Sequence, residues 1–170
     1  MSLIPVRPAP LIDESISGYI LRLAMANGWH TPSKFMSVLG WPSQVSISIV
    51  NSALIERLHK ITGHDELLNK NYFLPDNDKV FERQSGTVFS SMAISHVQLC
   101  PACLGEHSHH RSTWLYLPFT HCIEHQQRLL QCCPHCDETF KWNNSLLGSG
   151  CSNCGYTWQE MISQPISVPD

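Results

Sequence analysis

Apolar residues at helical spacing predict that the first part of the chain folds as a group of short helices. The first helix is expected to follow Asp13, a favourable N-cap, and to end at Asn27-Gly28, a common C-terminal stop. Thr31-Pro32 predicts the start of a second helix, because proline fits the first helical position. In both segments the apolar positions lie three or four residues apart, which gives each helix one face for a core.

Two more helical segments are expected further along. One runs from about Ser46 or Ser48 to Ile61 and stops at Gly63, and a short one begins with Asp65 as its cap. Short helices joined by tight glycine-bearing turns fit a helix-turn-helix-like bundle. A simple small helical domain fits the same pattern equally well.

The pattern changes after this region, and four parts are expected. They are a helical domain at 1–73, a linker at 74–97, a cysteine-rich domain at 98–160 with short β hairpins, and a loose tail at 161–170. The apolar run Trp114–Leu117, which a proline follows, predicts a short strand. Three aromatic residues here are expected to cover the small core between the two zinc sites, rather than to stack on bases or anchor a protein partner: Trp114, Tyr116 and Phe119.

Composition places the chain among small globular proteins. It has 170 residues, of which 42% are hydrophobic and 15% are charged. No segment approaches the roughly 20 apolar residues of a membrane span, and the N-terminus has no secretory signal pattern. We therefore expect no membrane association, a cytoplasmic location and cysteines that stay reduced.

Seven of the eight cysteines and one histidine form two sets of paired hooks. Each hook is a C-x2-C or C-x2-H unit, and 18 residues separate the hooks of the first set and 14 those of the second. This spacing is typical of tetrahedral structural zinc, so residues 98–160 are expected to form tandem zinc fingers. The expected ligands are Cys100, Cys103, Cys122 and His125 for one Zn²⁺, and Cys133, Cys136, Cys151 and Cys154 for a second Zn²⁺.

Two of these ligands have a neighbouring alternative. Cys132 also stands near Cys136, but Cys133 is preferred because a proline follows it, as in the first hook of the other set. His125 is preferred over His121 because only His125 completes a C-x2-H hook. Three further histidines are expected beside the ligands or at the surface: His107, His109 and His110.

The charge balance disfavours tight DNA binding by the chain alone. The formal net charge is −3, and the excess of acidic groups lies in residues 96–170. Zinc with its thiolates brings the total to roughly −6, whereas affinity for nucleic acid depends mostly on cations that neutralise phosphates. Arg57 and Lys60 form the one close cationic pair of the helical region, and Glu56 lies beside them.

The metal sets do not have the pattern of an enzyme. Each supplies four ligands, whereas catalytic zinc keeps an open coordination position. His64-Asp65-Glu66 matches the first half of the deaminase arrangement, but Leu99 rather than proline precedes Cys100. No phosphate-binding loop, nucleophile elbow or paired-carboxylate motif is present. The sequence therefore predicts a non-enzymatic protein with no catalytic residues, whose metal ions support a binding surface.

Two segments of the chain together have a recognisable pattern. The first is Glu14-Ser15-x-x-Gly18-Tyr19-x-x-Arg22-Leu23-Ala24. The second is the order Cys100-Pro-x-Cys103, Arg111, Trp114, Cys122, His125 and Cys133-Pro-x-Cys136. In combination they resemble the TniQ/TnsD family of transposon target-selection proteins. One departure is that His109-His110 replace an aromatic residue expected shortly before Arg111. The resemblance implies a helix-turn-helix domain followed by two zinc fingers with the eight ligands given above.

The resemblance also implies a role. It indicates a bacterial adaptor protein that marks a target site for DNA integration and recruits a TnsC-like AAA+ ATPase, the transposition regulator that brings the transposase. Because the chain stops soon after Cys154, it looks like the short form of CRISPR-associated transposons. There a CRISPR effector complex with guide RNA finds the target DNA, which the adaptor contacts mainly through the assembly. The alternative is a self-sufficient zinc-finger and helix-turn-helix protein that recognises a DNA sequence by itself.

Overall fold

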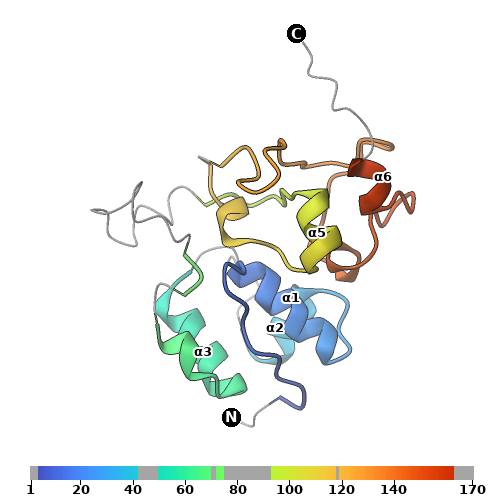
Figure 1. Ribbon diagram of the computed structural model, residues 1–170. Coiled ribbons are helices and arrows are strands. Elements are labelled where there is room, and N and C mark those ends of the chain that lie inside the picture. Colours follow the sequence, from blue (N-terminus) through green and yellow to red (C-terminus); the bar gives the residue numbers. More distant parts are fainter. Residues whose placement is uncertain (1–3, 42–49, 70–71, 75–92, 118, 163–170) are drawn as a thin grey trace.

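The computed structural model of the chain describes residues 4–41, 50–69, 72–74, 93–117 and 119–162. Figure 1 shows the N-terminal helices in the lower half of the view: α1 (Ile16–Ala26), α2 (Pro32–Val38) and α3 (Ser52–Thr62). The cysteine-rich half lies above them with α5 (Pro101–His107) and α6 (Trp158–Ile162). Three short 3₁₀ helices complete the described elements: η1 (Asp65–Leu68), η2 (Ser112–Leu115) and η3 (Asn144–Leu147).

The start of α1 differs from the expected one. Ser15, not Asp13, is the N-cap, and its hydroxyl oxygen accepts a hydrogen bond from the N–H of Gly18 at 2.9 Å. Asp13 instead takes a left-handed φ of 62° and turns the chain into the helix. The turn is held from the other half of the molecule, where the N–H of Ser112 donates to the carbonyl of Asp13 at 2.7 Å. A distant contact therefore decided which of two good capping residues is used.

Of the three later helix starts, only that of the second helix agrees with the sequence prediction. The second helix begins at Pro32 as expected. The third begins at Ser52, with the Asn51 side chain accepting from the N–H of Leu54, and ends before Gly63 as expected. Positions 46 and 48, the starts considered for it, lie outside the described residues. The short fourth segment is η1, in which Asp65 is the first helical residue rather than the cap.

The strand expected at Trp114–Leu117 is wrong. The chain forms η2 there, and only Tyr116 makes an isolated antiparallel bridge, with Ala93. The reason lies in the packing of successive residues. Trp114 is buried in the core of the cysteine-rich half, whereas Leu115 is buried in the core of the helical half. Tyr116, the next residue, is buried in the same helical core as Leu115. A strand would point these two consecutive side chains to opposite faces, so this burial pattern fits a helical turn rather than a strand.

The helix α1 also serves both cores. Ile16, Tyr19 and Ile20 are fully buried in the helical half, while Leu21 is fully buried in the cysteine-rich half. The small, mostly helical class with two cysteine clusters is confirmed, whereas the helix-turn-helix character and the domain boundaries stay predictions. None of the described helices is long and apolar enough to cross a membrane.

Candidate metal centres and the buried hydrogen-bond chain beside them

The first group of metal-ligating side chains, cluster 1, consists of Cys100, Cys103, Cys122 and His125. The Sγ atoms of Cys103 and Cys122 are 3.5 Å apart. Nδ1 of His125 lies 3.3 Å from Sγ of Cys103, 3.6 Å from that of Cys122 and 3.7 Å from that of Cys100. Zinc bonds of about 2.3 Å to sulfur and about 2.0 Å to nitrogen separate tetrahedral ligands by roughly 3.5–3.8 Å. The spacing of cluster 1 therefore suits one zinc ion.

The second group, cluster 2, consists of Cys133, Cys136, Cys151 and Cys154. Its sulfur atoms are 3.8 Å apart for Cys133 and Cys154, and 3.7 Å apart for Cys136 and Cys151. These two distances are opposite edges of one tetrahedron. Each cluster can thus hold one zinc ion, as expected, and ligation by these eight residues in particular stays a prediction.

Three of the four hooks share one backbone turn. In each, the N–H four residues after the first cysteine donates to that cysteine's carbonyl: Gln126 to Cys122 at 2.9 Å, Asp137 to Cys133 at 2.9 Å and Gly155 to Cys151 at 3.0 Å. The three donors have left-handed φ values of 53°, 57° and 76° in the same order. A bridge flanks each turn: His121 with Arg128, Cys132 with Thr139 and Gly150 with Thr157. The expected β hairpins are therefore reduced to single bridges in the described residues.

The remaining hook is built on a helix. Cys100 is the N-cap residue of α5, Pro101 is its first helical residue, and Cys103 lies in the first turn. Proline suits this position because the first helical N–H has no intrahelical partner. The Cys-Pro-x-Cys pattern thus starts a helix in cluster 1, whereas the same pattern forms a tight turn in cluster 2.

The alternative ligands lie outside the clusters. Cys132 is half-buried and occupies the bridge position beside Thr139. His121 occupies the equivalent bridge position of the other turn, and its Nδ1 is 2.9 Å from Oγ1 of Thr120. The repeated turn therefore supports Cys133 and His125 as the ligands, because each stands where the backbone geometry directs a side chain toward the cluster.

The thiols of each cluster lie close enough to shift one another's ionisation. Hydrogen bonding with Cys103 lowers the pKa of Cys100 to about 5, and the same contact raises the pKa of Cys103. In cluster 2 the Asn153 side chain helps to lower the pKa of Cys136 to about 6, while burial raises the pKa of Cys133 to about 12. Neighbouring thiolates repel one another, so all of them ionise together only around a cation. The donor set therefore fits Zn²⁺.

A buried hydrogen-bond chain lies between the clusters and α1. Nδ1 of His110 is 2.9 Å from the hydroxyl of Ser15, and Nε2 of His110 is 2.9 Å from the carbonyl of Gln98. Because that carbonyl only accepts, Nε2 carries the proton and Ser15 donates to Nδ1. The His110 ring also packs against Trp114 and Trp142, with centroid distances of 4.9 and 4.7 Å. His110 thus packs as an aromatic residue would and, in addition, makes two hydrogen bonds.

Cluster 1, the buried hydrogen-bond chain and α1 lie within one region of sequence similarity to a known family. A family model described as TniQ matches residues 5–129. The chain belongs to the TniQ family. The TniQ match includes cluster 1 and ends before cluster 2, and membership associates the chain with transposition in a targeting or adaptor role. Comparison with curated proteins gives no match.

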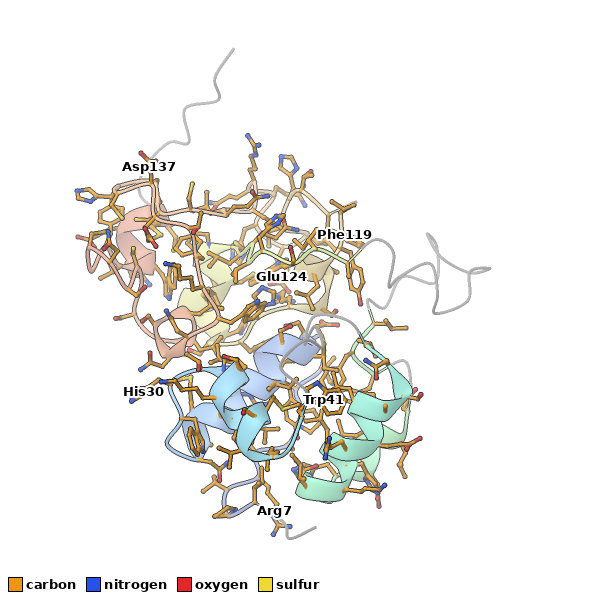
Figure 2. All side chains as sticks on the ribbon, turned by 180° about the vertical axis from the view of Figure 1, so that it is seen from behind. Arg7, His30, Trp41, Phe119, Glu124 and Asp137 are labelled. Carbon is orange, nitrogen blue, oxygen red and sulfur yellow. The ribbon has the colours of Figure 1, made fainter. Side chains whose placement is uncertain are left out.

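Outside cluster 1, the TniQ-like signature of α1 has structural contacts. The buried carboxylate of Glu14 accepts from Nε and Nη2 of Arg22 at 2.8 and 2.7 Å and from the N–H of Leu11 at 3.0 Å. The backbone of Glu14 also forms an isolated antiparallel β-bridge with the backbone of Arg111. The guanidinium of Arg111 donates to Glu124 at 2.7 Å. Figure 2 shows Glu124 near the middle of the molecule, where the two halves meet.

Several residues of this TniQ protein were missed or misplaced by sequence reasoning. Sequence reasoning found neither the contact of Glu124 with Arg111 nor that of Glu106 with His125. The helical spacing of Cys100, Cys103 and Glu106 is a signal that points to this contact. His64 belongs to neither cluster, and its Nε2 lies 3.0 Å from the carbonyl of Arg7. Of the three aromatic residues expected between the zinc sites, only Trp114 is buried in the core of the cysteine-rich half, whereas Tyr116 is buried in the helical core and Phe119 packs partly against it.

Proposed function

We propose that this TniQ-family protein is a non-enzymatic targeting adaptor of a CRISPR-associated transposon. In this role it links an RNA-guided complex on the target DNA to a TnsC-like AAA+ ATPase, which recruits the transposase in the bacterial cytoplasm. The observation that carries the proposal is the TniQ match over residues 5–129.

The metal centres support a role without catalysis. Each cluster gathers four ligand atoms around one point, which fills a tetrahedral zinc ion and leaves no position for a substrate. Among the described residues, no third group of metal-ligating side chains accompanies them. Closed sites of this kind stabilise a fold, so the zinc ions are expected to shape a binding surface.

The charge of the chain supports dependence on partners for DNA contact. The formal net charge is −3, and bound zinc with its thiolates makes the protein more negative, at roughly −6. Repulsion from the phosphate backbone then opposes tight binding by the chain alone. On α3, the exposed Lys60 lies one turn from Glu56, so the helix has no purely cationic face there.

A pull-down tests the proposed link. Tagged protein is mixed with the ATPase and ATP, with and without the effector complex, its guide RNA and target DNA. We expect ATPase to be retained, with more retained when the DNA-bound effector complex is present. Retention in neither mixture would refute the adaptor role.

A gel shift separates this role from self-sufficient DNA recognition. The zinc-loaded chain alone is expected to bind DNA weakly and to lose it to competitor DNA. Lys60→Glu is the matched variant, because it reverses an exposed charge on α3 without touching either cluster. Tight, competitor-resistant binding that Lys60→Glu abolishes would favour the self-sufficient DNA binder instead.

A further inference from the structure

The imidazole of His125 is held between cluster 1 and a carboxylate. Its Nδ1 faces the three sulfur atoms of the cluster at 3.3–3.7 Å. Its Nε2 lies 3.3 Å from Oε1 of Glu106. The second oxygen of Glu106, Oε2, lies 3.6 Å from Nε2 of His107. Glu106 is half-exposed, whereas the His125 side chain is only 21% exposed, so the ring is largely enclosed between its two partners.

The helix α5 places this carboxylate by its own periodicity. Cys100, Cys103 and Glu106 follow one another at intervals of three residues, from the N-cap to the last turn of the helix, and so lie toward one side of it. The same helix therefore supplies two thiolates and the carboxylate, while the turn at Cys122 supplies the histidine. A single rigid element thus fixes the distance between the metal position and Glu106.

We propose that Glu106 is a positioning residue for the zinc ion of cluster 1. Neutral imidazole carries one proton, and Nδ1 binds zinc only when that proton is on Nε2. The Glu106 carboxylate accepts a hydrogen bond from Nε2–H, which selects this tautomer, orients the ring and makes Nδ1 a stronger donor. The inference rests on zinc binding by cluster 1, and it goes beyond the adaptor role.

Zinc release from the full-length, zinc-loaded protein tests the role of Glu106. Metal analysis first establishes two zinc ions per chain; a chain that holds no zinc in cluster 1 would refute the ligand assignment and, with it, the role of Glu106. With a chromophoric chelator, Glu106→Gln is expected to release one zinc ion about 10–100-fold faster than the unmodified protein. The other zinc ion is the internal control, because cluster 2 contains no imidazole. Glu56→Gln, at an exposed site on α3, is expected to change neither rate.

A double substitution separates positioning from a general loss of stability. His125→Cys gives cluster 1 four thiolates, which need no tautomer. In that background Glu106→Gln is expected to leave zinc release unchanged or to slow it, because a carboxylate beside a thiolate is repulsive. Equal acceleration in both backgrounds would overturn the proposal.

Nitrogen NMR of labelled histidine gives a direct reading of the tautomer. In the zinc-loaded protein, His125 is expected to show a metal-bound Nδ1 and a slowly exchanging proton on Nε2. In Glu106→Gln that proton is expected to exchange faster, since its charged acceptor is lost. A proton on Nδ1, or unchanged exchange in Glu106→Gln, would contradict the assigned role.

Discussion

Gly18 lies where α1 comes closest to the segment before η2. A Cβ atom on Gly18 would stand 2.9 Å from Oγ of Ser15, 3.0 Å from Cβ of His110 and 3.2 Å from its carbonyl oxygen. These atoms belong to the buried chain that joins the two halves, and none of them is the free end of a flexible side chain. Glycine is therefore needed here for close approach, although it is a weak helix former.

Replacing Gly18 tests this close approach. Gly18→Ala is expected to lower the free energy of unfolding by about 1–3 kcal/mol, because overpacking outweighs the gain in helix propensity. Gly105→Ala is the matched control, since its nearest neighbour is the mobile amide end of Gln159 at 3.3 Å. It is expected to be neutral or to stabilise by up to about 1 kcal/mol. Urea unfolding of both variants measures the difference, and equal stability would contradict the argument.

His110 gives the protein a pH dependence of known sign. Burial lowers the pKa of His110 from 6.5 to about 3. Between pH 6.5 and pH 3, His110 binds a proton in the unfolded chain but not in the folded chain. Its contribution to stability is therefore complete above pH 6.5 and is lost as the pH falls toward 3.

The contribution of His110 is measured against a variant. His110→Asn is expected to be less stable at pH 7 but to lose less stability between pH 7 and pH 5.5. Acid also removes zinc from both proteins, so the difference between their two slopes isolates the histidine. Parallel slopes in urea unfolding at the two pH values would contradict the prediction.

Among the structural elements, the two clusters differ in their protection from solvent. Cluster 1 has three buried thiols, whereas in cluster 2 Cys154 is exposed and Cys136 is half-buried. Figure 2 shows Asp137, in the turn after Cys136, at the outer end of the cysteine-rich half. Solvent and chelators therefore reach cluster 2 more easily.

This difference predicts two phases of zinc release. A chelator is expected to remove the zinc ion of cluster 2 several times faster than that of cluster 1. In Cys136→Ser, which removes a ligand from cluster 2 alone, the fast phase is expected to disappear and the slow phase to remain. A fast phase that survives this substitution would show that cluster 1 is the labile site.

At the scale of the whole molecule, α1 couples the helices to the metal centres. Leu21 is fully buried in the core that contains the cysteines, and Leu58 of α3 is fully buried in the helical core. The two leucines are alike in burial and differ in which core they fill. They therefore form a matched pair for asking how far zinc binding depends on each core.

Truncating this pair tests the coupling. Leu21→Ala and Leu58→Ala are each expected to cost about 2–5 kcal/mol of stability, from lost burial and the cavity that remains. Leu21→Ala is expected in addition to speed zinc release from cluster 1, while Leu58→Ala leaves that rate nearly unchanged. Unfolding and chelator kinetics measure the two effects. Equal release rates in both variants would mean that the cores are not separately coupled to the metal.

The sequence by itself determined the features that depend on short-range chemistry. Structural zinc sites are typically built from pairs of cysteine or histidine ligands a few residues apart, so the two ligand sets could be predicted without a structure. The start of α2 at Pro32 and the end of α3 before Gly63 could also be predicted, because the backbone preference of a single residue decides each of them.

Only the tertiary structure decided what depends on distant partners. Ser15 replaced Asp13 as the cap, and His110 entered the core, through a contact that spans 95 positions of the chain. Gln126 and Asp137 adopt a left-handed backbone conformation at the turn position that Gly155 occupies in the third turn. The flanking β-bridges and the cluster hold these two residues in that conformation. Such choices follow from which surfaces meet on folding, and local preference does not contain that information.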